Sequence, residues 1–200
     1  ERTEEQNTRE NQNILYKNAR RLLGLVNQLL DISKLESGSM KLRTKPRNIV
    51  PLLKALAMSF KSYAERKRIT LKFNSTEDKI LAYLDDDKIE KIITNILSNA
   101  FKFTPKGGSI TTSLEVRDDD VIVCVKDTGI GIPEEAENYV FDRFRKVDDS
   151  NMQLFRGSGL GLSICKNLVE KMNGKIWFER VPKPNSGSHF YFYIPCNRNQ

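Results

Sequence analysis

The chain of 200 residues lacks most of the features that hold small secreted domains, metal centres or membrane proteins together. Its three cysteines, Cys124, Cys165 and Cys196, are odd in number, far apart and not in a CxxC pair, which argues against a disulfide framework or a zinc site and fits a reducing compartment. No apolar run reaches the length of a membrane span, and no signal peptide opens the chain. With 38% apolar and 30% charged residues, the sequence predicts a soluble globular protein with a real core.

Three common nucleotide-binding signatures are also absent. No GxxxxGK[ST] phosphate loop occurs in the sequence. The glycine run at residues 157–161 has the pattern GxGxG rather than GxGxxG, and no acidic residue follows a βαβ unit as a dinucleotide site requires. The HRD, DFG and VAIK sequences of Ser/Thr/Tyr protein kinases are missing as well. A nucleotide site in this chain would therefore have to belong to another class.

The net charge of +7 is concentrated in one segment. Residues 41–72 contain ten lysines and arginines and a single acidic residue, Glu65. Such a patch can bind nucleic acid, but no recognition motif or exposed aromatic platform accompanies it. We therefore favour a solvated basic face or an acidic protein partner, and we expect no nucleic-acid binding.

A long amphipathic helix is predicted from Asn11 to Glu36, after ten polar and acidic residues that we expect to be frayed. Leu15, Leu22 and Leu29 repeat every seven residues, as in the seam of a coiled coil or helical bundle. Because one helix cannot bury such a seam alone, it predicts a partner helix or a second copy of the chain. We divide the chain into a partial dimerisation helix at residues 1–38, a linker or first strand at 39–45, and a second domain at 46–200.

The second domain alternates between helical and extended patterns. Helices are expected at about residues 49–67, 85–105 and 159–172, the last capped by Gly174, and strands at about 69–73, 80–84, 109–116, 121–126, 175–180 and 189–195. Residues 117–120 suit a hairpin turn. The long irregular segment at 133–158 is typical of a lid or binding loop. This order predicts an α+β fold, a two-layer sandwich with helices on one face of a mixed, mostly antiparallel sheet, preceded by the long helix.

The helix predicted at residues 85–105 carries an unusual polar stripe. Asn95, Asn99 and Lys102 fall at i, i+4 and i+7, along one edge of an apolar face. Asparagine is a poor residue for a helix interior, so two on one stripe require a reason. A solvated helix edge is one explanation; a site where amide oxygens meet a hard cation and a lysine meets phosphate is the other.

Two glycine-rich turns could complete such a site. The sequence DTGIG starts at Asp127, at the end of a predicted strand, where glycines let a ligand approach the backbone and a carboxylate can accept a hydrogen bond from an amine. The sequence GSGLG at residues 157–161 opens a helix, whose free N–H groups can hold phosphate. An ordinary turn and a tight helix–strand connection explain the same residues equally well.

Four segments in this order resemble the nucleotide-binding boxes of bacterial sensor histidine kinases. NILSNAFKFT is similar to the N box, DTGIGIP to the first glycine box, VFDRFRKVD to the F box and GSGLGLSICKNLVEKMNGKI to the second glycine box. RLLGLVNQLLDISKLESGSM resembles the second helix of the family's dimerisation and phosphoacceptor domain. The resemblance covers residues 11–195 and implies a Bergerat-type ATP-binding fold.

The resemblance implies an ATP and Mg²⁺ site, with each role carried over by position. Asn99 would ligate Mg²⁺, with Asn95 supporting it, and Lys102 and Lys146 would face the phosphates. Asp127 would accept a hydrogen bond from the adenine amine. The remaining residues would line the base or the triphosphate; they are Phe103, Gly129, Gly131, Gly157, Gly159, Leu160 and Gly161. Residues 133–158 would form the ATP lid.

The phosphoacceptor histidine of the family and its helix are missing from this sequence. His189, the sole histidine, alternates with the apolar residues of the last predicted strand and is interpreted as structural or surface-exposed. The resemblance thus implies a cytoplasmic piece of an inner-membrane sensor, with no membrane contact of its own. It would dimerise through its first helix, supply phosphoryl groups for relay to a response-regulator receiver domain, and not label itself.

Two other functions share this fold. ATP-hydrolysing clamps such as DNA gyrase and MutL have a glutamate as general base four residues before the metal-binding asparagine. That position is Asn95 in this chain, which cannot take a proton, so a kinase with slow hydrolysis is favoured. A nucleotide-binding or dimerisation module without catalysis is the third possibility.

Overall fold

A computed structural model describes residues 2–145, 158–181 and 186–196, and the chain divides into two compact units, Glu1–Lys41 and Leu42–Gln200. The first unit contains one helix, α1 (Arg2–Glu36). The expectation of a frayed end is wrong for residues 2–10, because this stretch, with three glutamates and two arginines, is part of the helix. The helix ends at Glu36, as predicted, and Gly38 follows in the left-handed conformation with φ +66°. Within the described residues, no helix combines the length and the apolar character needed to cross a membrane.

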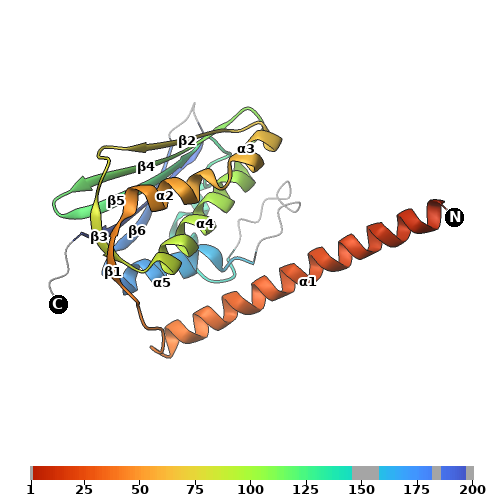
Figure 1. The fold of residues 1–200 in the computed structure, drawn as a ribbon, viewed down its shortest axis with the longest axis horizontal. Coiled ribbons are helices and arrows are strands. Elements are labelled where there is room, and N and C mark those ends of the chain that lie inside the picture. The colour runs from red at the N-terminus through yellow and green to blue at the C-terminus, as the bar shows by residue number, and fades with distance from the viewer. Residues whose placement is uncertain (1, 146–157, 182–185, 197–200) are drawn as a thin grey trace. The chain divides into compact units, whose positions relative to one another are not determined.

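The second unit is built on a five-stranded sheet (Figure 1). The strand order is β2-β4-β5-β7-β6, with β2 parallel to β4 and all other pairs antiparallel. The strands are β2 (Thr70–Ser75), β4 (Ser109–Arg117), β5 (Asp120–Asp127), β6 (Lys175–Arg180) and β7 (Ser188–Pro195). The predicted hairpin joins β4 to β5, and its central residues Asp118 and Asp119 have φ of 49° and 65°, as a type I′ turn requires.

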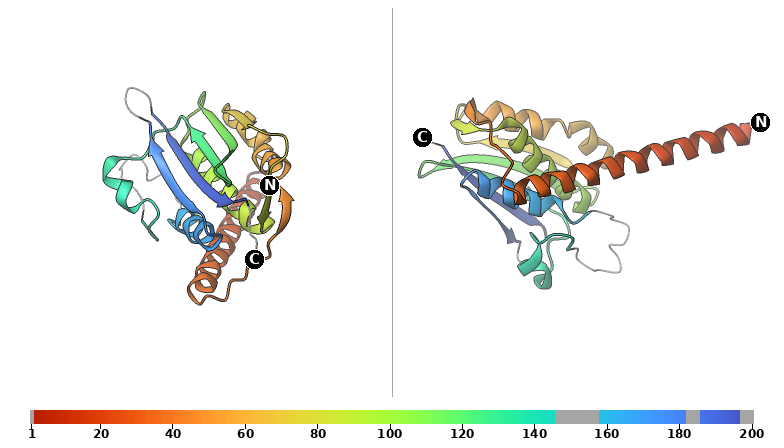
Figure 2. Two further views of the ribbon diagram at one scale, coloured as in Figure 1. Left: turned by 90° about the vertical axis from the view of Figure 1, so that its left-hand side faces the viewer. Right: turned by 90° about the horizontal axis from the view of Figure 1, so that it is seen from below.

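Helices cover one face of this sheet, as the views in Figures 1 and 2 show. The covering helices are α2 (Ile49–Met58), α4 (Asp86–Phe103) and α5 (Gly161–Lys171). Alternate strand residues on this face are buried, among them Val121, Val123 and Val125 of β5 and Phe192 of β7. A 3₁₀ helix, Glu134–Tyr139, lies in the segment expected to be irregular. The predicted α+β two-layer fold with a mixed sheet is therefore confirmed.

The helix predicted over residues 49–67 is two helices, α2 and α3 (Lys61–Lys67). At the break, the Ser59 hydroxyl donates to the Leu56 carbonyl at 2.7 Å, a back-bond that bends helices. Phe60 follows, and its ring stacks on Phe101 of α4 with centroids 5.4 Å apart. Phe60 thus packs in the interface with α4 next to the break, and the local periodicity does not indicate the break itself.

The cap at the end of α5 also differs from the prediction. Asn173, rather than Gly174, adopts the left-handed conformation, with φ +60°. The N–H groups of Asn173 and Gly174 donate to Glu170 and Val169, which completes a Schellman motif. Gly174 is required for another reason, since a Cβ at this position would collide with the Tyr193 carbonyl of β7.

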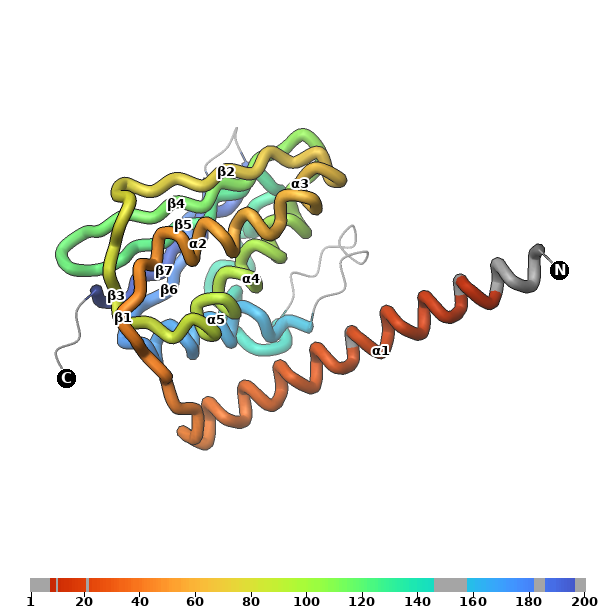
Figure 3. Tube along the Cα trace, in the orientation of Figure 1, coloured from red at the N-terminus to blue at the C-terminus, as the bar shows by residue number. Residues whose placement is uncertain are grey.

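A small second sheet connects the start of this unit to α4. β1 (Lys45–Asn48) and β3 (Leu81–Leu84) pair antiparallel, side by side in the trace of Figure 3. β3 leads directly into α4, so the β1 segment is anchored next to the helix that carries the polar stripe.

Candidate functional site

The helix α4 is fixed at its start by a cap and along its length by burial. Asp85 is the N-cap, and its carboxylate accepts a hydrogen bond from the Lys88 N–H at 3.3 Å. Ile89, Ile92 and Ile96 are fully or almost fully buried on the face that packs toward the sheet. This packing fixes the position of α4 on the sheet, including the edge of the helix next to the buried face.

The polar stripe runs along that edge. Asn95, Asn99 and Lys102 are all half-buried. The Asn95 amide donates to the Lys91 carbonyl at 2.8 Å, and its Oδ1 faces Gly161, where an added Cβ would come within 2.8 Å. The Lys102 ammonium lies 4.6 Å from the centroid of the Phe103 ring. The predicted stripe thus exists, and one end of it touches the start of α5.

Asp127, the last residue of β5, points to the helix-covered side of the sheet and is 6% exposed. Its carboxylate accepts a hydrogen bond from the Gly129 N–H at 2.8 Å. Burial raises the pKa of Asp127 from 3.8 to about 6, and hydrogen bonds from the Gly129 and Ser188 N–H groups oppose this rise. The partners of this buried carboxylate are two backbone N–H groups. Its oxygens can therefore accept another hydrogen bond from a ligand.

The glycine turn after Asp127 packs against the end of α4. An added Cβ on Gly129 would lie 2.6 Å from the Phe103 carbonyl, and the Ile130 N–H donates to that carbonyl at 3.3 Å. Gly131 has φ +79°, which favours glycine. The backbone of Phe103 and the DTGIG turn are therefore in direct contact.

The sequence analysis did not identify two residues that lie next to Asp127. Ser188 pairs with Asp127 in the register of β5 and β7. Gly187 has φ +140°, and a Cβ at this position would collide with the Asp127 carbonyl. Both lie some 60 residues from Asp127 in sequence, and only the β5–β7 pairing brings them to it.

The second glycine run shapes the start of α5. Gly159 has φ +72°, and its carbonyl accepts from the Phe144 N–H at 3.0 Å. Leu160 is 1% exposed, and its N–H donates to the Ser158 hydroxyl at 3.2 Å. α5 begins at Gly161, beside Asn95, so its unpaired N–H groups lie at the end of the polar stripe.

These contacts join Asn95 of α4 to the start of α5, and Phe103 of α4 to the turn that follows β5. Lys146 and Gly157, which were predicted to belong to the site, lie outside the described residues. Among the residues described, no group of three or more His, Cys, Asp or Glu could hold a metal ion. Amide oxygens such as those of Asn95 and Asn99 are ligands that Mg²⁺ accepts.

Comparison with known proteins decides the family. Residues 84–198 match the model of the histidine kinase-, DNA gyrase B-, and HSP90-like ATPases. The chain belongs to this ATPase family. The match starts one residue before the N-cap of α4 and includes every predicted nucleotide box.

Relatives and solved structures place the chain among the sensor histidine kinases of this ATPase family, which confirms the resemblance. Hybrid signal transduction histidine kinase D of Dictyostelium discoideum is 37% identical over 198 residues, 96% of this chain and 13% of that protein. Full-length ShkA in complex with AMPPNP matches with a TM-score of 0.77 and 28% identity, over 88% of this chain and 36% of that one. Histidine kinase ThkA in complex with response regulator protein TrrA matches with a TM-score of 0.68 and 25% identity, over 87% of this chain and 48% of that one. The chain thus spans a minor part of these relatives and corresponds to the ATP-binding catalytic portion of a sensor kinase.

Proposed function

We propose that the chain binds ATP with Mg²⁺ along the polar edge of α4 and that its parent transfers the γ-phosphoryl group to a histidine. Two contacts of α4 support this proposal: Asn95 faces Gly161 at the start of α5, and the Phe103 carbonyl accepts from the turn that follows the buried Asp127. Family membership and the ShkA complex with AMPPNP support it.

The base would lie at the Asp127 end of the site. Asp127 is proposed to accept a hydrogen bond from the adenine amine. Its carboxylate is buried, and the backbone N–H groups of Gly129 and Ser188 leave it able to accept a further hydrogen bond. Gly129 and Gly131 would let the base approach the backbone, and Phe103, whose carbonyl holds the turn, would pack beside the nucleotide.

The triphosphate would lie toward the start of α5. The oxygen of Asn99 would hold Mg²⁺, supported by Asn95, and Lys102 and Lys146 would face the phosphates. Gly157, Gly159 and Gly161 would bound the triphosphate, with the buried Leu160 packing behind them. When bound, Mg²⁺ would neutralise phosphate charge, and the chain's own residues would orient the nucleotide. Charge neutralisation and positioning together make up most of the catalysis of phosphoryl transfer.

Partners follow from the same proposal. The phosphoryl group would pass to a histidine on the dimerisation domain and then to an aspartate of a response regulator, a kind of partner with which ThkA has been solved. α1 would pair with a second copy of the chain. His189 is on the face of β7 opposite the buried Phe190 and Phe192, so incubation with labelled ATP should leave no label on it.

Calorimetric titration with AMPPNP, with and without Mg²⁺, tests the site. We expect Mg²⁺-dependent binding by the unaltered chain, loss of the Mg²⁺ dependence in Asn99→Ala, and at least tenfold weaker binding in Asp127→Ala. Asn74→Ala, at an exposed asparagine of β2, is the matched control and should bind normally. A folded chain that binds no nucleotide, or equal binding by all variants, would refute the proposed site.

A further inference from the structure

The sheet face opposite the helices carries a polar cavity of its own. Residues that alternate with the buried ones point to this face, and the strand registers place Lys72, Thr111, Lys126, His189 and Glu179 in one row across all five strands. At the β4–β5–β7 part of this row lies a cavity of about 590 Å³. Its polar lining includes Ser109, Thr111, Lys126, Thr128, Ser186 and His189.

This cavity is separate from the candidate ATP site. Lys126 and Asp127 are consecutive residues of β5, so their side chains point to opposite faces of the sheet. Asp127 also borders the cavity, but its carboxylate is buried on the helix side and bonded to the Gly129 N–H, so only its backbone can face the cavity. A ligand bound here would therefore not occupy the position of the nucleotide.

The lining offers hydrogen-bond donors and positive charge. Within the described part of the chain, Lys126 makes no ion pair. The hydroxyls of Thr111 and Ser186 make no hydrogen bond with any described residue. Thr128 is engaged locally, since its hydroxyl accepts from the Ser109 N–H at 2.8 Å. Asp127 is the one acidic residue in the described lining, and its carboxylate already accepts the Gly129 N–H. An anion is the complement of such a surface.

The surroundings of His189 fit the same chemistry. Burial and the neighbouring Lys126 ammonium lower the pKa of His189, while Glu179 on β6 raises it. His189 is therefore mainly neutral at pH 7, next to an ammonium group. An anion bound between the two would offset the Lys126 charge and favour protonation of the imidazole.

We propose that this cavity binds a small oxyanion, a carboxylate or phosphate compound of metabolite size, between Lys126, His189 and the hydroxyls of Thr111 and Ser186. Its volume is within the usual range of small-molecule sites. The proposal does not depend on ATP binding at the other face.

The chain supplies its own reporter, because His189 is its sole histidine. The experiment follows the imidazole signals of His189 by NMR as pH is varied, in the nucleotide-free chain. Inorganic phosphate and citrate are the probes, and sodium chloride at equal ionic strength is the control. With phosphate, citrate or both we expect a saturable rise in the proton affinity of His189 of about threefold or more, and little change with chloride.

Two lysine variants show whether the cavity is responsible. Lys126→Gln should abolish the response, whereas Lys72→Gln, which removes the same charge from the same row outside the cavity lining, should keep it. Both lysines are exposed, so urea unfolding should show that each variant folds normally. Equal loss in the two variants, an equal response to chloride, or no response to either oxyanion would each overturn the proposal.

Discussion

At the residue scale, Asp127 combines a cost in stability with a proposed role in nucleotide binding. Its pKa is raised from 3.8 to about 6 in the folded chain by burial. A carboxyl whose folded pKa exceeds its unfolded pKa contributes stability that is complete below the unfolded value and is lost as pH rises through the folded value. At about 1.4 kcal/mol per pKa unit, the ionised Asp127 lowers the free energy of unfolding by up to ~3 kcal/mol above pH 6.

Asp127→Asn should therefore stabilise the chain while weakening nucleotide binding. We expect the free energy of unfolding to rise by about 2 kcal/mol at pH 7.5, with the gain disappearing toward pH 4. Affinity for AMPPNP should fall, because the charged acceptor is lost. Urea unfolding at several pH values and calorimetry measure the two effects. A variant that is less stable than the parent at pH 7.5 would contradict this account of Asp127.

Gly161 is a second test at the residue scale. An added Cβ would lie 2.8 Å from the Asn95 Oδ1, the end of a side chain that can move. Alanine suits a helix start better than glycine, so Gly161→Ala should fold and displace the Asn95 amide. We expect AMPPNP binding to weaken at least tenfold with the free energy of unfolding almost unchanged. Gly24→Ala, where nothing lies within 4 Å of the new methyl group, is the control and should bind like the parent.

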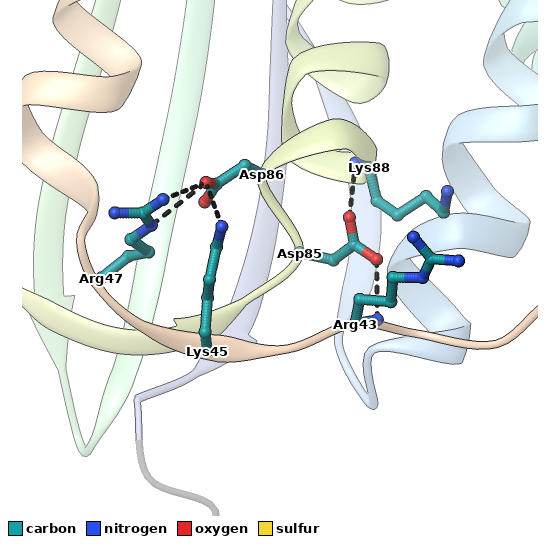
Figure 4. Close-up of polar contacts among 6 residues, drawn as sticks. All are labelled: Arg43, Lys45, Arg47, Asp85, Asp86 and Lys88. Carbon is teal, nitrogen blue, oxygen red and sulfur yellow. Dashed lines mark hydrogen bonds and ion pairs between the residues drawn. The ribbon is translucent and has the colours of Figure 1, made fainter.

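At the element scale, two aspartates connect the start of α4 to the β1 segment (Figure 4). Asp85 accepts hydrogen bonds from the Lys88 N–H and from the Arg43 N–H, the latter at 2.9 Å. Asp86 forms ion pairs with Lys45 at 3.3 Å and Arg47 at 2.9 Å. Because Asp85 is 4% exposed and the lysine and arginine are half-exposed, we expect the Asp85 contacts to contribute more to stability.

Asp85→Ala should lower the free energy of unfolding by about 2 kcal/mol, because it removes the N-cap of α4 and leaves the Arg43 N–H without its acceptor. Asp86→Ala should lower it by less than about 1 kcal/mol, and that effect should shrink at high salt. Asp87→Ala, at an exposed residue of the same turn, is the control. Chemical unfolding at low and high salt compares the three, and a larger loss for Asp86 than for Asp85 would show that the ion pairs dominate.

At the scale of the whole molecule, α1 exposes an apolar seam that no other described helix of its unit can cover, since that unit contains α1 alone. The exposed fractions of Leu15, Leu22 and Leu29 are 68%, 64% and 50%. Contiguous exposed apolar surface of this kind marks an association site. The proposed homodimer through α1 follows from this seam.

Sedimentation velocity measures that association directly. We expect the chain to dimerise increasingly with concentration, and the double variant Leu22→Glu, Leu29→Glu to remain monomeric because it places charges in the seam. Leu81→Glu, at a 56% exposed leucine of β3, is the matched control and should dimerise like the parent. A parent chain that stays monomeric at high concentration would refute dimerisation through α1.

Local patterns in the sequence were enough to predict most elements and the polar stripe on which the proposed site depends. The Asn95–Asn99–Lys102 stripe, the Asp85 cap and the turn at Asp118 depend on residues a few positions apart, so periodicity and turn chemistry predict them. The order of the boxes also determined the family, because four spaced motifs together are far more specific than one.

The tertiary structure alone decided what depends on contacts between distant segments. The stack of Phe60 on Phe101 joins the break between α2 and α3 to α4, and the need for Gly174 follows from the Tyr193 carbonyl of another strand. Ser188 and Gly187 reach Asp127 only through the β5–β7 register, and the same register places His189 next to Lys126. Strand pairing and close packing join residues far apart in sequence, and no local period encodes which of them will meet.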